Sequence, residues 1–274
     1  MALAAFASFG SSGQLGLANA QQENKTLTQP QVIPSVTTNI TKMNIVLVHG
    51  AWADASSWGG VIPILLKAGH RVIAVELPEH SLADDVATAK RAINLVGGPV
   101  TLVGHSYGGF VITNAAYNNP NVKNLVYIAA FAPKEGQTIS DFVNPLKFPK
   151  GALINDEEGF LYFSNPTQFH DLFAQDVDPV QSDIMFAVQK PINSSIFAEK
   201  SGPPAWKQLP TWYQVSDDDH SIPPDIERKF AKQMNATTTS LPASHVSYVS
   251  HPDEIAKLIL EAANNSTRVE KVGQ

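Results

Sequence analysis

The feature that most constrains the fold is a short apolar run that ends in a glycine-flanked serine. Residues 100–103 are apolar or β-branched, Ser106 stands between Gly104 and Gly108, and a second apolar run follows from Phe110. This G-x-S-x-G spacing between a strand and a helix predicts a sharp turn with the serine in a strained backbone conformation. Side chains two residues before or after the serine would collide there, so both positions need glycine. The hydroxyl is then displayed above the edge of a sheet, at the positive end of the following helix.

Further apolar or β-branched runs predict the sheet to which this turn belongs. We expect strands at residues 43–48, 71–76, 125–129, 211–215 and 237–241, besides the run before Ser106. Continuous apolar strands are typical of a parallel sheet, whose two faces are both covered. Helices are predicted from a Ser56 or Ser57 cap to about residue 68, then at 82–96, 225–234 and 252–263. The alternation predicts an α/β fold: a mostly parallel sheet of about six strands, with helices on both faces and right-handed crossovers.

This alternation stops between residues 133 and 209. The segment is rich in Pro, Asn, Asp and Phe, and only 168–174 and 181–189 have a helical pattern. We interpret it as a lid inserted over the strand ends, and the alternative is irregular structure that covers the core. The chain then divides into a leader with linker (1–41), an α/β core (42–132 and 210–265), the lid insertion (133–209) and a C-terminal tail (266–274).

The first twenty residues have some features of a secretory signal. They are small and apolar, and Ala18-Asn19-Ala20 has the form of a cleavage site, but basic residues are missing and residues 10–14 interrupt the run. We therefore expect a secreted or periplasmic protein, with a cytoplasmic one as the alternative if the leader is artificial. The run is too short and too broken to span a bilayer.

Composition argues against several classes of function. The formal net charge is −6 and no run of Lys or Arg occurs, which argues against nucleic acid or an anionic membrane as the main partner. The chain has no cysteine, so disulfides, thiolate chemistry and cysteine-based metal sites are excluded.

A serine hydroxyl becomes a strong nucleophile only with a base and a carboxylate that orients the base. Both residue types follow later strands: the acidic run Asp217–Asp219 comes after 211–215, and His245 comes after 237–241. The ends of parallel strands meet at one edge of the sheet, where the serine also stands. His245 is favoured over His251, which begins a helix, and over His105, whose side chain should diverge from the serine. The remaining candidates read as loop or surface histidines: His70, His80, His170 and His220.

The residues alone do not decide which aspartate orients the base, because three stand in a row and the run could be a solvated loop or a weak calcium site.

The transition state of acyl transfer also needs two donors for its oxyanion. The amide of Tyr107, next to the serine, is one candidate. The amide of Ala51 is the other, since Gly50 permits a tight turn after the first strand.

Together these residues resemble the α/β-hydrolase superfamily over about residues 43–263. They are most similar to a compact branch with small bacterial esterases, plant methylesterases and hydroxynitrile lyases. The matching segments are 46–51 with Trp58, 69–72, 104–109, 129–133, Asp219 with 222–224, and 244–245. The resemblance implies a catalytic triad of Ser106, Asp219 and His245, with Asp217 as the second choice for the acid, and an oxyanion hole of the Ala51 and Tyr107 amides. One departure is the sequence Glu-Leu-Pro-Glu-His at 76–80, where relatives often have Asp-Leu-Pro-Gly-His-Gly, which leaves this turn open.

The same resemblance disfavours two other reactions of the fold. Haloalkane dehalogenases and epoxide hydrolases have an aspartate where this chain has Ser106. Hydroxynitrile lyases of this branch add a lysine near the late aspartate and a hydroxyl-bearing residue after His-Gly, but residues 216–226 lack lysine and the second position is Ala51.

We therefore expect a serine carboxylic-ester hydrolase that acts through an acyl-enzyme on small, largely apolar esters, with no cofactor and no metal. Trp52, beside the oxyanion hole, is predicted to line the substrate pocket. Lactone hydrolysis, including that of acyl-homoserine lactones, is the nearest alternative because its chemistry is the same. A non-catalytic small-molecule-binding protein on the same fold is the second alternative, and a perhydrolase side activity would use the same residues. The oligomeric state stays open.

Overall fold

The computed structural model describes residues 42–143 and 148–269. The predicted leader and linker (1–41), with its signal-like residues 1–20, lies outside these ranges, as do residues 270–274 of the predicted tail. No helix within the described ranges is long and apolar enough to cross a membrane.

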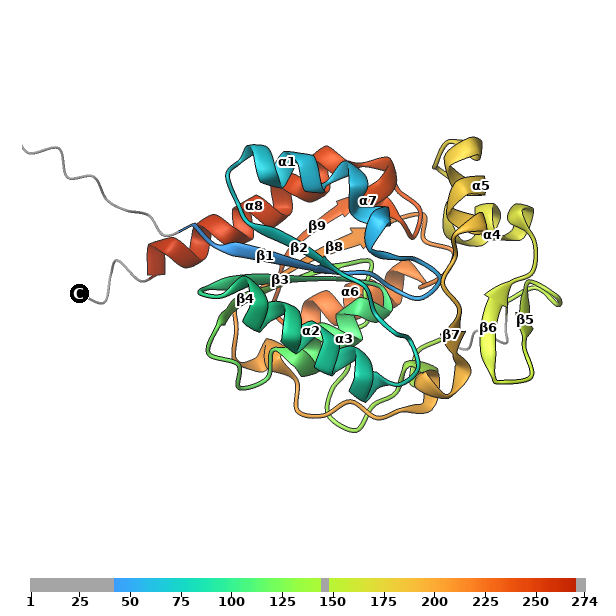
Figure 1. Ribbon diagram of the computed structural model, residues 1–274, viewed down its shortest axis with the longest axis horizontal. Coiled ribbons are helices and arrows are strands. Elements are labelled where there is room, and N and C mark those ends of the chain that lie inside the picture. The colour runs from blue at the N-terminus through green and yellow to red at the C-terminus, as the bar shows by residue number, and fades with distance from the viewer. Residues whose placement is uncertain (1–41, 144–147, 270–274) are drawn as a thin grey trace, which may run out of the picture. The chain divides into compact units, whose positions relative to one another are not determined.

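Six parallel strands form the central sheet, as the sequence predicts (Figure 1). In sheet order they are β2 (Val72–Val75), β1 (Asn44–Val48), β3 (Val100–His105), β4 (Val122–Ile128), β8 (Thr211–Ser216) and β9 (Thr237–Leu241). Every neighbouring pair is parallel. All carboxyl ends therefore meet at one edge, and the loops that leave this edge carry the candidate site.

Helices cover both faces of the sheet. Figure 1 shows α1 (Ile62–Lys67) and α8 (Pro252–Val269) above the sheet, and α2 (Leu82–Val96) and α3 (Tyr107–Ala115) below it. A further helix, α6 (Pro224–Gln233), packs on β8, and the short α7 (Ser247–Ser250) joins β9 to α8. The central strands are thus enclosed on both sides, which is why their sequences are continuously apolar.

Local capping explains where two of these helices begin. The Ser81 hydroxyl accepts the Asp84 amide at the start of α2, as predicted. The predicted cap at Ser56 or Ser57 is wrong. The side chain of Asp54 accepts both of their amides and starts a 3₁₀ turn, Ala55–Gly60, so that α1 itself begins only at Ile62. Asp54 stands ahead of the two serines, and its Oδ1 accepts both of their amides, so the cap lies two residues earlier than predicted.

The last helix is longer than the sequence predicts. It was expected to end near residue 263, with a tail from 266, but α8 continues to Val269. The residues that extend it carry no glycine or proline that would stop a helix.

Residues 133–209, which we call the insertion, contain a small sheet that the sequence analysis did not predict. Strands β5 (Leu153–Asn155), β6 (Phe160–Phe163) and β7 (Ile192–Asn193) pair antiparallel. The two expected helices are present as α4 (Pro166–Phe173) and α5 (Pro179–Ala187), each beginning about two residues earlier than expected, at a proline. Strands this short carry too little alternation to be distinguished from loops. The rest of the described insertion is loop and short 3₁₀ turns: η2 (Ile139–Asp141), η4 (Ser194–Ala198) and η5 (Ala205–Lys207).

Candidate active site

Ser106 occupies the turn between β3 and α3, with a backbone φ of 52° and ψ of −122°. A Cβ added at Gly104 would lie 2.5 Å from the carbonyl oxygen of Gly108, and one added at Gly108 would lie 2.5 Å from the carbonyl oxygens of Val48 and His49. Both distances are shorter than real Cβ contacts, so the two glycines are required for the turn. The strained, glycine-flanked serine that the sequence predicts is therefore present.

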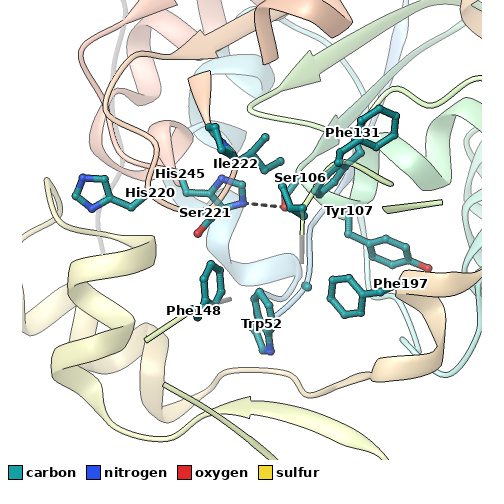
Figure 2. A pocket seen from close by; sticks show the side chains of 14 residues that line it. Trp52, Ser106, Tyr107, Phe131, Phe148, Phe197, His220, Ser221, Ile222 and His245 are labelled. Atoms are coloured by element: carbon teal, nitrogen blue, oxygen red, sulfur yellow. Dashed lines mark hydrogen bonds between the residues drawn. The ribbon is translucent and has the colours of Figure 1, made fainter. Parts of the chain in front are cut away.

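The structure brings Ser106, His245 and Asp219 together in one hydrogen-bonded chain. His245 Nε2 lies 2.8 Å from Ser106 Oγ (Figure 2), and His245 Nδ1 lies 2.5 Å from Asp219 Oδ2. A carboxylate only accepts, so Nδ1–H donates to Asp219 and leaves Nε2 to accept the serine proton. The serine and the aspartate are each 5% exposed and the histidine 1%, which keeps water away from the chain of bonds.

Backbone hydrogen bonds fix the acid in this chain. The second oxygen of Asp219, Oδ1, accepts the amides of Ser221 and Ile222 at 2.6 and 2.7 Å. Asp217 instead forms an ion pair with Arg228 at the surface, and Asp218 is exposed. Within the described residues no cluster of three or more histidines and acids could hold a metal ion, so nothing there favours the calcium-site alternative.

A second buried acid, Glu227 on α6, stands close to Asp219. Its Oε2 accepts the Ser216 amide at 2.9 Å. Burial, and next the charge of Asp219, raise the pKa of Glu227 well above its ordinary value. Burial and the neighbouring charge both favour the protonated form of Glu227 beside Asp219. The sequence carries no signal for this residue, since one glutamate on an amphipathic helix reads as a surface residue.

His105, the residue before the serine, supports the backbone of His245. Its side chain diverges from Ser106, as predicted, and its Nε2–H donates to the carbonyl oxygen of His245 at 2.9 Å. Burial lowers the pKa of His105 well below its ordinary value, so the ring stays neutral beside the base. The rings of Phe173 and Tyr248 pack against the two histidines.

The expected oxyanion residues lie beside the serine. A Cβ on Gly50 would come within 2.6 Å of Ser106 Cβ, so the loop after β1 passes directly against the nucleophile. As the first residue of α3, Tyr107 has an amide with no partner inside its own helix. Ala51 and Tyr107 both line the same cavity as Ser106 and His245.

That cavity has a volume of about 260 Å³ and a largely apolar lining. Trp52 lies in its wall with φ at 59°, and its indole N–H donates to the carbonyl oxygen of Leu161 in β6 at 3.0 Å. Figure 2 shows Trp52 with Phe148 and Phe197 on the side opposite His245. The apolar side chains of the lining come from both the core and the insertion: Phe131, Phe142, Val143, Phe148, Phe197 and Ile222.

Two of the histidines expected at loop or surface positions make specific contacts there. His220 lines the cavity, where its Nδ1 lies 2.7 Å from the carbonyl oxygen of Asp171. His70 is buried and lies 2.8 Å from the carbonyl oxygen of Met43. Neither role has a local sequence signal, because both depend on partners 27 or more residues away.

The comparison with known proteins agrees with this fold and site. The chain belongs to the alpha/beta hydrolase family, whose model matches residues 45–258. It is similar to the pyrethroid hydrolase of Sphingobium wenxiniae, with 27% identity over 259 residues, covering 82% of this chain and 89% of the relative. It is also similar to Methylesterase 8 of Arabidopsis thaliana, with 25% identity over 210 residues, covering 68% of this chain and 76% of the relative.

Among solved structures, the crystal structure of a pyrethroid hydrolase has the same fold, with a TM-score of 0.72 at 23% identity over 82% of this chain and 98% of that one. The resemblance to bacterial esterases and plant methylesterases is thereby confirmed. The chain is a hydrolase of the carboxylesterase type.

Proposed function

We propose that the protein hydrolyses small, largely apolar carboxylic esters through an acyl-enzyme on Ser106. The observation that supports this most is the hydrogen-bonded chain from Ser106 through His245 to Asp219 at the wall of an apolar cavity. Relatives named as hydrolases and esterases support the same class of substrate.

In the proposed reaction, Ser106 Oγ attacks the ester carbonyl carbon while His245 Nε2 takes the hydroxyl proton. The amides of Ala51 and Tyr107 stabilise the negative charge that develops on the carbonyl oxygen. When the tetrahedral intermediate collapses, the leaving alcohol takes the proton from Nε2. Water then attacks the acyl-enzyme with the same base, which regenerates the free serine and releases the acid.

Asp219 has two roles in this scheme. It fixes the tautomer of His245 with the proton on Nδ1, and it stabilises the imidazolium that forms during each half of the reaction. The two backbone amides on Oδ1 hold the carboxylate in place, so that Oδ2 stays aimed at the ring.

The cavity supports a small substrate. Its volume of about 260 Å³ is just below the range of about 300–1,000 Å³ typical of sites for drug-sized ligands. Its aromatic lining gains most from an apolar acyl or alcohol group, because removing apolar area from water is the main source of affinity in such sites.

The test is the hydrolysis of p-nitrophenyl esters of graded acyl length, with lactones in the same panel, by the wild type and Ser106→Ala. We expect turnover of short esters and a loss on the order of 10⁴–10⁶ in kcat/KM for the variant. The matched control, Ser195→Ala, removes an exposed hydroxyl of the insertion and should leave the rate unchanged. Wild-type rates in Ser106→Ala would exclude the proposed nucleophile, and turnover confined to lactones would change the substrate class.

A further inference from the structure

The reaction proposed above makes no use of a carboxyl group buried behind the oxyanion loop (residues 49–52). Glu79 follows β2 with no exposed surface and a backbone φ of 57°. Among the described groups, neither of its carboxyl oxygens has a hydrogen-bond partner. Residues other than glycine are uncommon in this left-handed region, so contacts rather than local preference hold Glu79 in place.

These contacts tie the backbone of Glu79 to the site. Its amide donates to Asp85 Oδ1 at 2.8 Å, and the phenol of Tyr107 donates to Asp85 Oδ2 at 2.5 Å. Its carbonyl oxygen accepts the amide of Asn193 in β7 at 3.0 Å. The turn at Glu79 is therefore connected through Asp85 to Tyr107, an expected oxyanion residue, and through Asn193 to the insertion.

The carboxyl group itself faces His49, with Oε1 3.7 Å from Nδ1. The amide of Leu77 lies 3.0 Å from His49 Nε2 and can only donate, so Nε2 accepts. The ring proton is then on Nδ1, which lies 2.9 Å from the carbonyl oxygen of Gly50 and donates to it. A second proton would have to sit on Nε2, where it would break the bond from Leu77. Burial has the largest influence on the pKa of His49 and lowers it. The ring therefore stays neutral and does not act as a counter-ion for Glu79.

The other charged or titratable groups around Glu79 leave it without a counter-ion. They come from α2, α3, the same loop and the insertion: Asp85, Tyr107, Glu76 and Lys190. Lys190 is the cation among these, and it is paired with Glu76 at 2.8 Å. Burial first, and then the charge of Asp85, raise the pKa of Glu79 well above its ordinary value, while burial raises the pKa of Asp85 to about 6.

Two neighbouring buried carboxyl groups do not both ionise readily. At neutral pH the charge falls on Asp85, which accepts two hydrogen bonds, and the proton stays on Glu79, which accepts none among the described groups.

We propose that Glu79 is kept as a neutral carboxylic acid, and that its neutrality positions the oxyanion loop by leaving the His49 Nδ1–H on the carbonyl oxygen of Gly50. That oxygen and the amide of Ala51 belong to one planar peptide group and point in opposite directions. A hydrogen bond on the oxygen therefore fixes the direction of the amide. An ionised Glu79 would compete for the imidazole N–H and release this peptide. Glu79 touches no reacting atom and acts as a positioning residue, and the inference rests on the proposed function through the role of Ala51.

The first experiment needs no turnover. Wild-type protein carrying ¹³C-labelled glutamate carboxyls and ¹⁵N amides is titrated by NMR, beside Glu79→Gln and the exposed control Glu157→Gln. We expect two glutamates, Glu79 and Glu227, to titrate far above the others, and one of these two signals to be missing from Glu79→Gln. The amide resonance of Ala51 should shift with the same midpoint in the wild type and the control, and show no such shift in Glu79→Gln. If Glu79→Gln removes none of the high-titrating glutamate signals, the inference is wrong.

The second experiment measures kcat and KM for a p-nitrophenyl ester from pH 6 to 9.5, corrected for the uncatalysed rate. In the wild type we expect kcat to fall at least about fivefold as Glu79 ionises, with KM nearly unchanged, because oxyanion donors bind the transition state more than the ester. Glu79→Gln, the neutral isostere, should match the wild type at pH 6 and lose this fall. A variant that follows the wild type at every pH, or that loses most of its kcat at pH 6, would overturn the inference.

The two experiments separate this inference from the proposed function. A protein whose Glu79 and Ala51 titrate together but which hydrolyses no ester would refute the serine mechanism and not the charge state of Glu79. A protein that hydrolyses esters through Ser106, but in which Glu79→Gln removes no high-titrating glutamate signal, would refute the role of Glu79 alone.

Discussion

The cavity beside Ser106 is bounded by core loops on one side and by the insertion on the other, and the two sides are built differently. On the core side each polar group follows a strand of the parallel sheet, and backbone contacts of glycine and aspartate fix its place. On the insertion side the wall is a cluster of rings around Trp52, with ring centroids 5.0 to 6.4 Å apart.

This difference separates chemistry from selectivity. Hydrogen bonds of fixed geometry on the core side set the reaction, whereas contacts between rings on the insertion side set what fits the cavity. Changes to the first side should therefore lower kcat by orders of magnitude. Changes to the second should alter the preference among esters by much less.

The largest effect is expected from His245→Gln, which removes the base but keeps most of the side-chain volume. Because His245 is the side chain that hydrogen-bonds Ser106 Oγ among the described residues, kcat should fall by about 10⁵–10⁶. His251→Gln is the matched control: His251 lies 3.8 Å from Asp176, does not line the cavity, and should cost less than about twofold in kcat. Equal losses in the two variants would contradict the choice of His245.

Asp219→Asn is the next largest. The amide can present its N–H to His245 and select the wrong tautomer, so we expect a loss of about 10³–10⁴ in kcat. Asp217→Asn changes the same loop at a surface ion pair with Arg228 and should leave kcat within about twofold. A smaller loss of kcat in Asp219→Asn than in Asp217→Asn would show that Asp217, rather than Asp219, orients His245.

The core side was largely predictable because its signals are local. The spacing of Gly104, Ser106 and Gly108 predicts the turn through collisions within a few residues, and the order of strands places His245 and the acidic run at the same edge. The choice of Asp219 among three aspartates came from a family resemblance rather than from the residues themselves.

The insertion side could not be predicted in the same way. The pairing of β6 with β7 and the bond from Trp52 to Leu161 both depend on partners distant in sequence. Local propensity carries little information about such contacts, since tertiary packing outweighs it.

Gly104→Ala tests the collision argument through stability rather than rate. Its Cβ would lie 2.5 Å from a backbone oxygen, which cannot move aside as a side chain can. We expect a loss of about 3 kcal/mol or more in the free energy of unfolding, at the upper end of ordinary overpacking. Gly59→Ala is the control, since nothing lies within 4 Å of its Cβ position. Thermal and urea unfolding measure both, and equal stabilities would refute the steric account of the turn.

The smallest effect is expected on the insertion side, from Phe197→Ala. Phe197 separates the cavity from a neighbouring hollow of about 520 Å³. Its removal should join the two and raise the ratio of kcat/KM for p-nitrophenyl octanoate over butyrate by about tenfold, with a small change in kcat. Phe160→Ala removes a ring that packs on His80 outside the cavity and should leave this ratio unchanged. A collapse of kcat for both esters would show that the ring supports the chemistry itself.

The most direct measurement asks which atom forms the covalent bond. A fluorophosphonate reacts with an activated serine by P–O bond formation and loss of fluoride. We expect one adduct per chain, on the peptide that contains Ser106, formed in proportion to the loss of ester hydrolysis and missing from both Ser106→Ala and His245→Gln. Complete inhibition with the adduct on another residue, or an active enzyme in which Ser106 resists labelling, would contradict the account.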